Sequence, residues 1–104
     1  MIQELHPEAE IELLEAAQWY GERSFQAGIN FVAAIEFALG VILESPERFQ
    51  RVGAVRVYRL DRFPYKIYYE WNETRQHVRV LCIMHNKRRP DYWRNRVASG
   101  SAEA

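Results

Sequence analysis

Residues 65–71 read YKIYYEW, and this stretch decides the predicted fold. Apolar and polar side chains alternate along it: Tyr65, Ile67, Tyr69 and Trp71 form one set, and Lys66, Tyr68 and Glu70 fall between them. Such alternation is typical of a β-strand with one buried face. Two β-rich runs of similar length flank it at residues 55–63 and 77–84, separated by Pro64 and by residues 72–75, which suit chain reversals. The pattern predicts a three-stranded antiparallel meander, to which residues 1–5 could add a fourth strand.

The first half of the chain has helical periodicity. HPEAEIELLEAAQWYGERS, residues 6–24, places apolar side chains on one stripe, and Pro7 suits the first helical position. INFVAAIEFALGVILES, residues 29–45, is apolar nearly all round, which predicts a helix covered on more than one side. Because Gly21 and Gly28 lie between the two segments, we expect an antiparallel hairpin. The predicted fold class is α+β: an N-terminal helical hairpin packed on a small, mainly antiparallel sheet of three to four strands.

The length of 104 residues fits one domain with one core. We expect that domain to cover residues 1–97, and residues 98–104 (ASGSAEA) to form a disordered tail. The single cysteine, Cys82, can neither close an internal disulfide nor supply a structural zinc site, so a buried thiol is expected. No segment reaches the roughly 20 apolar residues that span a bilayer. These features predict a soluble, cytoplasmic protein without a metal or cofactor.

Charge is divided unevenly along the chain, although the formal net charge is zero. Residues 1–47 carry one cation, Arg23, against nine acids, whereas the remainder carries thirteen lysines and arginines against five acids. Charge of one sign gathered on one half of a chain favours a partner such as a polyanion or an acidic protein segment. Two solvated faces without a partner would give the same pattern. We expect the sheet to leave a positively charged face open.

Four segments of the sequence resemble those of a known protein family. They are HPEAEIELLEAAQWY, SPERF, VRVYRLDRFPYKIYYEW and VLCIMHNKRRPDYW. In this order they resemble the RelE/ParE superfamily of toxins from bacterial type II toxin–antitoxin systems, which include plasmid-stabilisation systems. The resemblance covers about residues 2–94. It implies a small α/β toxin held in a hetero-oligomer with a cognate antitoxin, whose C-terminal part wraps the toxin. RelE-like members cut messenger RNA in the ribosomal A site, whereas ParE-like members poison DNA gyrase without known catalytic residues.

The candidate catalytic residues are His85, Arg88, Arg89 and Tyr92. Metal-free RNA cleavage through the 2′-hydroxyl needs a base, an acid and cations that hold the phosphate. His85 can exchange a proton near neutral pH, the two arginines can bind phosphate, and Tyr92 can stack on a base or donate a proton. Each also has a plainer reading. His85 would be a hydrogen-bonded structural histidine, the arginines would be solvated or paired with the acidic first helix, and Tyr92 with Trp93 would cap the core.

A second set of residues is predicted to bind the target or the antitoxin. It comprises Arg56, Arg62, Lys66, Lys87, Arg88, Arg89 and Trp93. The apolar second helix and the basic sheet could both receive an antitoxin segment, by helix-in-groove packing or by strand addition.

Lysine content separates the two branches of the superfamily. RelE-like members place paired lysines on the sheet, but this chain has only Lys66 and Lys87. The arginines of residues 55–63 have a pKa above about 12, so they are poor general bases. We therefore favour a ParE-like toxin that binds gyrase. The alternatives are a RelE-like ribosome-dependent endoribonuclease and an inactive member that only binds antitoxin.

Overall fold

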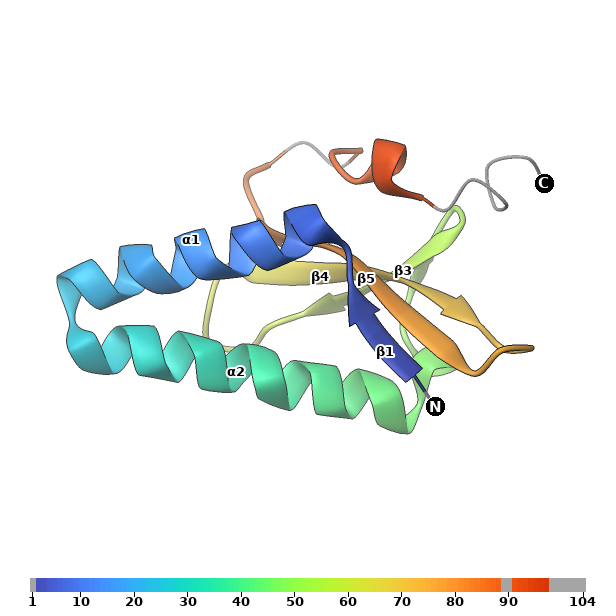
Figure 1. Cartoon of the computed structure of the whole chain (residues 1–104), viewed down its shortest axis with the longest axis horizontal. Coiled ribbons are helices and arrows are strands. Elements are labelled where there is room, and N and C mark those ends of the chain that lie inside the picture. The colour runs from blue at the N-terminus through green and yellow to red at the C-terminus, as the bar shows by residue number, and fades with distance from the viewer. Residues whose placement is uncertain (1, 89–90, 98–104) are drawn as a thin grey trace.

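The computed structural model describes residues 2–88 and 91–97. Its strands and helices follow in the order β1 (Ile2–Leu5), α1 (Pro7–Arg23), α2 (Phe25–Glu44), β2 (Arg51–Val52), β3 (Val55–Arg59), β4 (Tyr65–Asn72) and β5 (His77–His85). Two single turns of 3-10 helix, at Pro46–Arg48 and Arg94–Arg96, complete it. The helices lie as an antiparallel hairpin on one side of a twisted sheet (Figure 1). The predicted tail at residues 98–104 falls outside the described residues.

The sheet has five strands in the order β1-β5-β4-β3-β2. β2 to β5 form an antiparallel meander, and β1 adds parallel to β5, with Leu5 opposite Val80. The predicted α+β class, meander and opening strand are confirmed. The prediction of three to four strands was one short, because β2 has only two residues and cannot show alternation.

The hairpin turn differs from its prediction. Gly21 and Gly28 lie inside α1 and α2, and Ser24 alone joins the helices. The Ser24 amide donates to the Tyr20 carbonyl at the end of α1, while the Ser24 hydroxyl accepts the Ala27 N–H at the start of α2. A Cβ at position 28 would lie 2.9 Å from the Cα atom of Gly21. The glycines therefore permit close helix contact and do not form the turn.

The start of α1 is capped by His6. Its Nδ1 accepts the Glu8 N–H at 3.1 Å, and Pro7 occupies the first helical position, as predicted. Burial, aided by the positive charges of Arg79 and Arg96, lowers the pKa of His6 from its ordinary 6.5. The neutral ring that can accept this hydrogen bond is thus favoured in the folded protein.

One face of α2 fills the core between the hairpin and the sheet. Phe31, Ile35, Ala38 and Ile42 are all at most 1% exposed and pack against β4 and β5 residues. The sequence-based expectation that no segment could span a bilayer was wrong for α2, which is long and apolar enough to do so by length and composition alone. The core helix of a soluble protein meets the same two criteria. Of the most apolar 18 residues of α2, only 28% are buried, so much of the apolar surface of this helix faces solvent.

The turn at Pro46–Arg48 is fastened to the sheet by Tyr69. This side chain is fully buried, and its hydroxyl donates to the Pro46 carbonyl oxygen at 2.6 Å. Burial raises the pKa of Tyr69 to about 12, so the hydroxyl keeps its proton and remains a donor. Tyr69 is a core residue, as its place in the alternating strand predicts.

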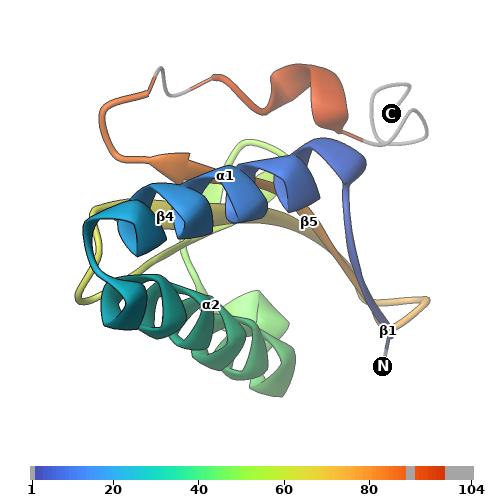
Figure 2. The same ribbon diagram turned by 60° about the vertical axis from the view of Figure 1, so that its left-hand side comes forward.

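β5 buries side chains on both faces of the sheet, and a β-bulge interrupts their alternation. Tyr68 pairs with Cys82 and Tyr69 with Val80, so Leu81 is the extra residue. Before and after it, Val80 and Ile83 point into the core beneath the helices. Leu81 and Cys82 belong to a second apolar cluster on the opposite face, with Val55, Val57, Tyr68, Met84 and Trp93. Figure 2 shows the C-terminal segment lying on the side of the sheet away from α2.

Candidate functional site

Three of the candidate catalytic residues line one pocket of about 530 Å³. His85, Arg88 and Tyr92 come from the end of β5 and the segment after it, and they face α1 across the pocket, where Glu15 and Trp19 also line it. The fourth candidate, Arg89, lies outside the described residues. Of the candidates, the pocket therefore brings together the imidazole of His85, the guanidinium of Arg88 and the phenol of Tyr92.

The imidazole of His85 is held in one orientation. Its Nδ1 accepts the Lys87 N–H at 3.1 Å, and its ring lies edge-on to Tyr65 with centroids 5.2 Å apart. A ring nitrogen that accepts a hydrogen bond carries no proton, so neutral His85 is protonated at Nε2. This is the geometry of an oriented histidine, which suits both a structural role and proton transfer.

Tyr92 lies between the pocket and the sheet. The guanidinium carbon of Arg88 is 5.3 Å from the Tyr92 ring centroid, and that of Arg96 is 4.8 Å from it. The ring also packs against the second apolar cluster. Two cation–π contacts and partial burial limit its freedom to stack on an incoming base. Arg88 itself is exposed and available to an anion.

The carboxylates of α1 weaken the pocket as a phosphate site. Glu12 and Glu15 both line it. Glu12 is engaged, since one oxygen accepts the Ile83 N–H at 3.0 Å and the other lies 2.8 Å from Arg96 Nη2. Glu15 is exposed, and its charge opposes that of Arg88 for any phosphodiester entering the pocket.

The predicted binding residues that the structure describes lie on several different elements. Arg56 is half-buried and donates through Nη1 to the Phe49 carbonyl oxygen at 2.9 Å. Arg62 is exposed in the loop between β3 and β4, beside α2. Lys66 is half-buried on β4, and Lys87 is exposed in the turn after β5. Lys66 and Lys87 are thus on different elements.

Trp93 covers the sheet. It is 5% exposed and stacks on Tyr68 with ring centroids 5.6 Å apart. Of its two predicted roles, binding and capping the core, the geometry supports the second. Met84 and Cys82 lie in the same cluster, and burial raises the pKa of the Cys82 thiol to about 12. The thiol is buried, as predicted, and stays protonated.

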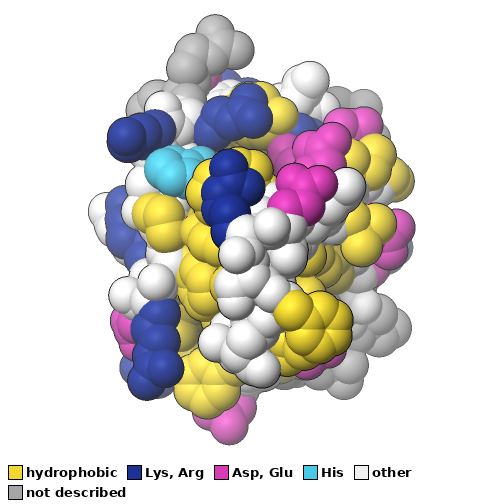
Figure 3. Space-filling model, turned by 90° about the vertical axis from the view of Figure 1, so that its left-hand side faces the viewer, with side chains coloured by type: hydrophobic (Ala, Val, Ile, Leu, Met, Phe, Trp, Pro, Cys, Tyr) yellow, Lys and Arg dark blue, Asp and Glu magenta, His cyan; other side chains and the backbone are white. Residues whose placement is uncertain are grey.

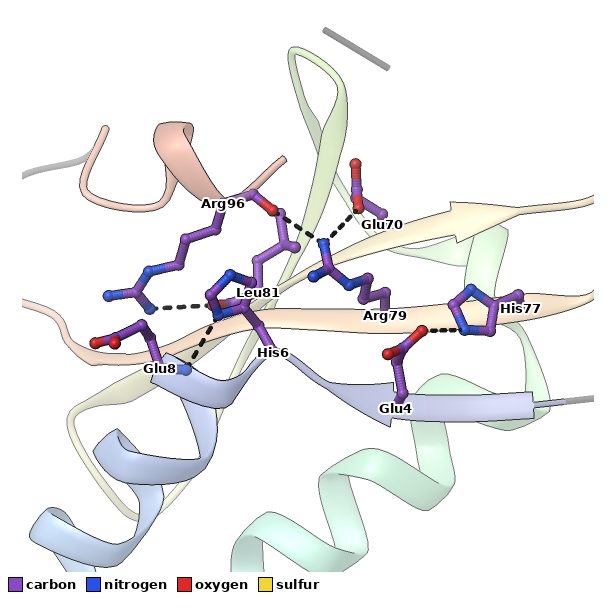
Figure 4. Close-up of polar contacts among 8 residues, drawn as sticks. All are labelled: Glu4, His6, Glu8, Glu70, His77, Arg79, Leu81 and Arg96. Atoms are coloured by element: carbon purple, nitrogen blue, oxygen red, sulfur yellow. Dashed lines mark hydrogen bonds and ion pairs between the residues drawn. The ribbon is translucent and has the colours of Figure 1, made fainter. Parts of the chain in front are cut away.

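Arg96 was not identified from the sequence, yet it fixes the C-terminal segment. It is 8% exposed, pairs with Glu12, and donates through Nη1 to the Leu81 carbonyl oxygen at 3.1 Å. Burial alone would lower the pKa of Arg96, but the hydrogen bond and charge of Glu12 outweigh it and the pKa is raised. Its backbone carbonyl in turn accepts from Arg79, which also lies 3.8 Å from Glu70 (Figure 4).

These contacts cover part of the sheet face that was expected to be open and basic. On the side away from the helices, Trp93 and Arg96 close part of the sheet, and Arg79 and Arg96 are paired with the protein's own acids. Leu81 has no pairing partner in β4 and lies beyond Val80, the last residue of β5 that pairs with β1; its carbonyl oxygen accepts from Arg96 instead. Other exposed cations lie on strands β2 and β3 (Arg51 and Arg59) and in the turns that precede and follow β4 and β5 (Arg62, Arg75, Lys87 and Arg88).

Comparison with known proteins gives a consistent result. Residues 4–90 match the family model described as "ParE toxin of type II toxin-antitoxin system, parDE". No curated protein sequence matches the chain. Among solved structures, the chain is similar to one titled "Chromosomal ParDE TA system from P. aeruginosa", with a TM-score of 0.70 and 16% identity over 82% of this chain and 95% of that one. At that identity the likeness concerns the fold alone.

Proposed function

The chain belongs to the ParE toxin family of type II toxin–antitoxin systems, and from this premise we propose that it inhibits growth by binding DNA gyrase. A cognate antitoxin neutralises it by forming a hetero-oligomer with it in the cytoplasm. No chemical step by the toxin is required for this role, because a bound protein can block an enzyme by occupying its surface.

The observation that supports a binding role is that the C-terminal segment covers one face of the sheet. Trp93 and Arg96 hold the C-terminal segment against the sheet face away from the helices. A substrate RNA laid on that face would have to displace a stacked tryptophan and a buried ion pair. Of the two lysines, Lys66 lies on a strand and Lys87 lies in the turn after β5, so the sheet carries one lysine where RelE-like members place a pair.

Purified toxin should inhibit supercoiling by gyrase and leave messenger RNA on translating ribosomes intact. Arg88→Ala, which removes an exposed cation beside the pocket, should weaken this inhibition. Arg75→Ala is the matched control, because Arg75 is also exposed but lies in the turn between β4 and β5, away from the pocket lining. Supercoiling unaffected by excess wild-type toxin would refute gyrase as the target.

Ribosome-dependent RNA cleavage is the second candidate, favoured by the meeting of His85, Arg88 and Tyr92 in one pocket. Proton transfer would fall to His85 or Tyr92, and phosphate binding to Arg88 with Arg89. The gyrase proposal would be refuted if the wild-type toxin cleaved messenger RNA on ribosomes and the cleavage were lost in His85→Ala, Tyr92→Phe or Arg89→Ala. If expression of the toxin alone causes no growth defect, the chain is an inactive member that retains only antitoxin binding.

A further inference from the structure

Residues 48–59, which include β2 and β3, carry positive charge only. They contain four arginines and no acidic residue: Arg48, Arg51, Arg56 and Arg59. The turn between β2 and β3 lies at the end of the molecule far from the turn between α1 and α2 (Figure 1). The helical end combines apolar, basic and acidic side chains on one surface (Figure 3). An anion that reaches β2 and β3, by contrast, meets no acidic side chain on these two strands.

Arg51 and Arg56 lie directly opposite each other. They are partners in the antiparallel pairing of β2 with β3, so both side chains lie on the same face of the sheet. Residues paired in this way have Cβ atoms about 4.5–5.5 Å apart, and like charges at such positions are destabilising. Among the residues that the structure describes, neither arginine forms an ion pair. An anion bound between the two guanidinium groups would relieve their repulsion.

A cation on an edge strand also has a plainer use, because charge discourages pairing with another chain. β2 is an edge strand of the sheet, so this use accounts for Arg51. It does not account for Arg56, which lies on the next strand and is half-buried. The Nη1 atom of Arg56 donates to the Phe49 carbonyl oxygen at 2.9 Å, which fixes the position of the guanidinium. Its other nitrogens form no hydrogen bond with the described residues, so they can bind a ligand.

Both arginines line a pocket of about 190 Å³, which we call the arginine pocket. Ala54, Trp71 and Glu73 complete its lining. A space of this size suits a single phosphate group. A guanidinium presents paired N–H donors that match two phosphate oxygens, and the apolar ring of Trp71 keeps water from part of the pocket, which strengthens such bonds.

Glu73 is the acidic residue in the lining of the arginine pocket. It is exposed in the turn after β4 and forms no ion pair with Arg51 or Arg56. Its charge opposes an entering anion, but two cations outweigh one carboxylate. The pocket therefore attracts a phosphate group, and removal of the Glu73 charge should increase that attraction.

We propose that the arginine pocket binds a backbone phosphate of the double-stranded DNA that gyrase holds. The inference rests on the proposed function and deepens it, because it gives the toxin a contact with DNA in addition to its contact with the enzyme. Arg51 is exposed at the edge of the sheet, so the DNA backbone can pass outside the pocket while one phosphate enters it. Gyrase brings duplex DNA close to any protein bound to it, which favours DNA over an acidic protein segment as the occupant.

Fluorescence anisotropy of a labelled DNA duplex, titrated with the full-length toxin at several salt concentrations, tests the pocket. Arg51→Ala should weaken binding at least about threefold and reduce the slope of log K against log salt by about 0.9, as expected for the loss of one phosphate contact. Arg51→Lys keeps the cation and should retain most of the slope.

Arg23→Ala is the matched control, because it removes the same charge from the far end of α1. There the Arg23 guanidinium carbon lies 3.4 Å from the Trp19 ring centroid. This variant should change the affinity less than about twofold and leave the salt slope as it is.

Two further measurements separate a phosphate site from a merely structural pair of arginines. Glu73→Gln should strengthen DNA binding, a gain that damage to the fold would not produce. Inorganic phosphate should shift the indole N–H signal of Trp71 in the NMR spectrum of the wild type but not in that of Arg51→Ala. Equal affinities of the wild type, Arg51→Ala and Glu73→Gln for DNA would overturn the site. Tighter binding of polyglutamate or of single-stranded RNA than of duplex DNA would refute DNA as the occupant.

A supercoiling assay distinguishes failure of this inference from failure of the proposed function. Arg51→Ala should raise the toxin concentration needed for half inhibition of gyrase at least about threefold, in line with its weaker DNA binding. Unchanged inhibition would refute the DNA contact and leave gyrase as the target. If the wild type binds DNA through Arg51 but does not inhibit gyrase, gyrase falls as the target while the phosphate site stands.

Discussion

The contact between Gly21 and Gly28 sets how closely α1 approaches α2, and Gly28→Ala tests it. The added Cβ would lie 2.9 Å from the Gly21 Cα atom and 3.2 Å from the Ala17 carbonyl oxygen. Both are backbone atoms, so relief requires the helices to separate. Overpacking of this kind costs about 1–3 kcal/mol. Replacing a helical glycine by alanine in open space instead stabilises by about 0.5–1 kcal/mol.

Gly40→Ala is the matched control, because position 40 lies in the same helix and a Cβ there meets nothing within 4 Å. The difference in unfolding free energy between the two variants isolates the packing cost of about 1–3 kcal/mol. Because 1 kcal/mol shifts the Tm of a domain of this size by about 4–8 °C, Gly28→Ala should melt at least about 4 °C below Gly40→Ala. Thermal unfolding followed by circular dichroism measures both. If Gly28→Ala melts at or above Gly40→Ala, the glycine contact does not limit the helix spacing.

Three further predictions concern buried polar contacts. Glu12→Ala leaves Arg96 buried without its carboxylate and should cost about 3–5 kcal/mol in urea unfolding; a loss below about 1 kcal/mol would mean that water replaces the pair. Tyr69→Phe removes the donor to the Pro46 carbonyl and should cost about 1–2 kcal/mol, whereas unchanged stability would show that this bond adds nothing. Because the folded-state pKa of His6 lies below its unfolded value of 6.5, the unfolded chain binds the proton more tightly, and stability should fall as the pH drops below about 6.5. His6→Asn keeps a capping acceptor and should lessen this acid dependence; the same slope in both proteins would exclude His6 as its source.

The fold was predictable where one physical signal dominated. Alternation along residues 65–71 indicated β4, although Tyr68, between the core residues Ile67 and Tyr69, is buried as well because the C-terminal segment covers the other face of the sheet. Gly21 and Gly28 were misread as turn residues because a sequence cannot distinguish a glycine needed for a bend from one needed for close packing. The apolar run at Val80 to Met84 indicated a strand buried on both faces, but the bulge at Leu81 depends on pairing with β4 and leaves no local pattern.

The candidate site was less predictable, because it depends on contacts distant in sequence. The proximity of His85, Arg88 and Tyr92 follows from their shared segment, and the structure brings them to one pocket. Arg96 gave no signal, since its role requires Glu12 of α1 and the Leu81 carbonyl of β5, both distant from it in sequence. The distribution of charge indicated a basic second half but could not show which of its arginines would form ion pairs within the protein.

The parallel pairing of β1 with β5 has a consequence for synthesis on the ribosome. Residues 2–5 pair with residues 77–80, so residues 6–76 must be made before the two partners of this pairing both exist. Pairing of residues so far apart in sequence loses loop-closure entropy before any stabilising contact between them has formed. The nascent chain therefore cannot add β1 to the sheet until residues 77–80 have left the ribosome, and every shorter nascent chain lacks this edge of the folded surface.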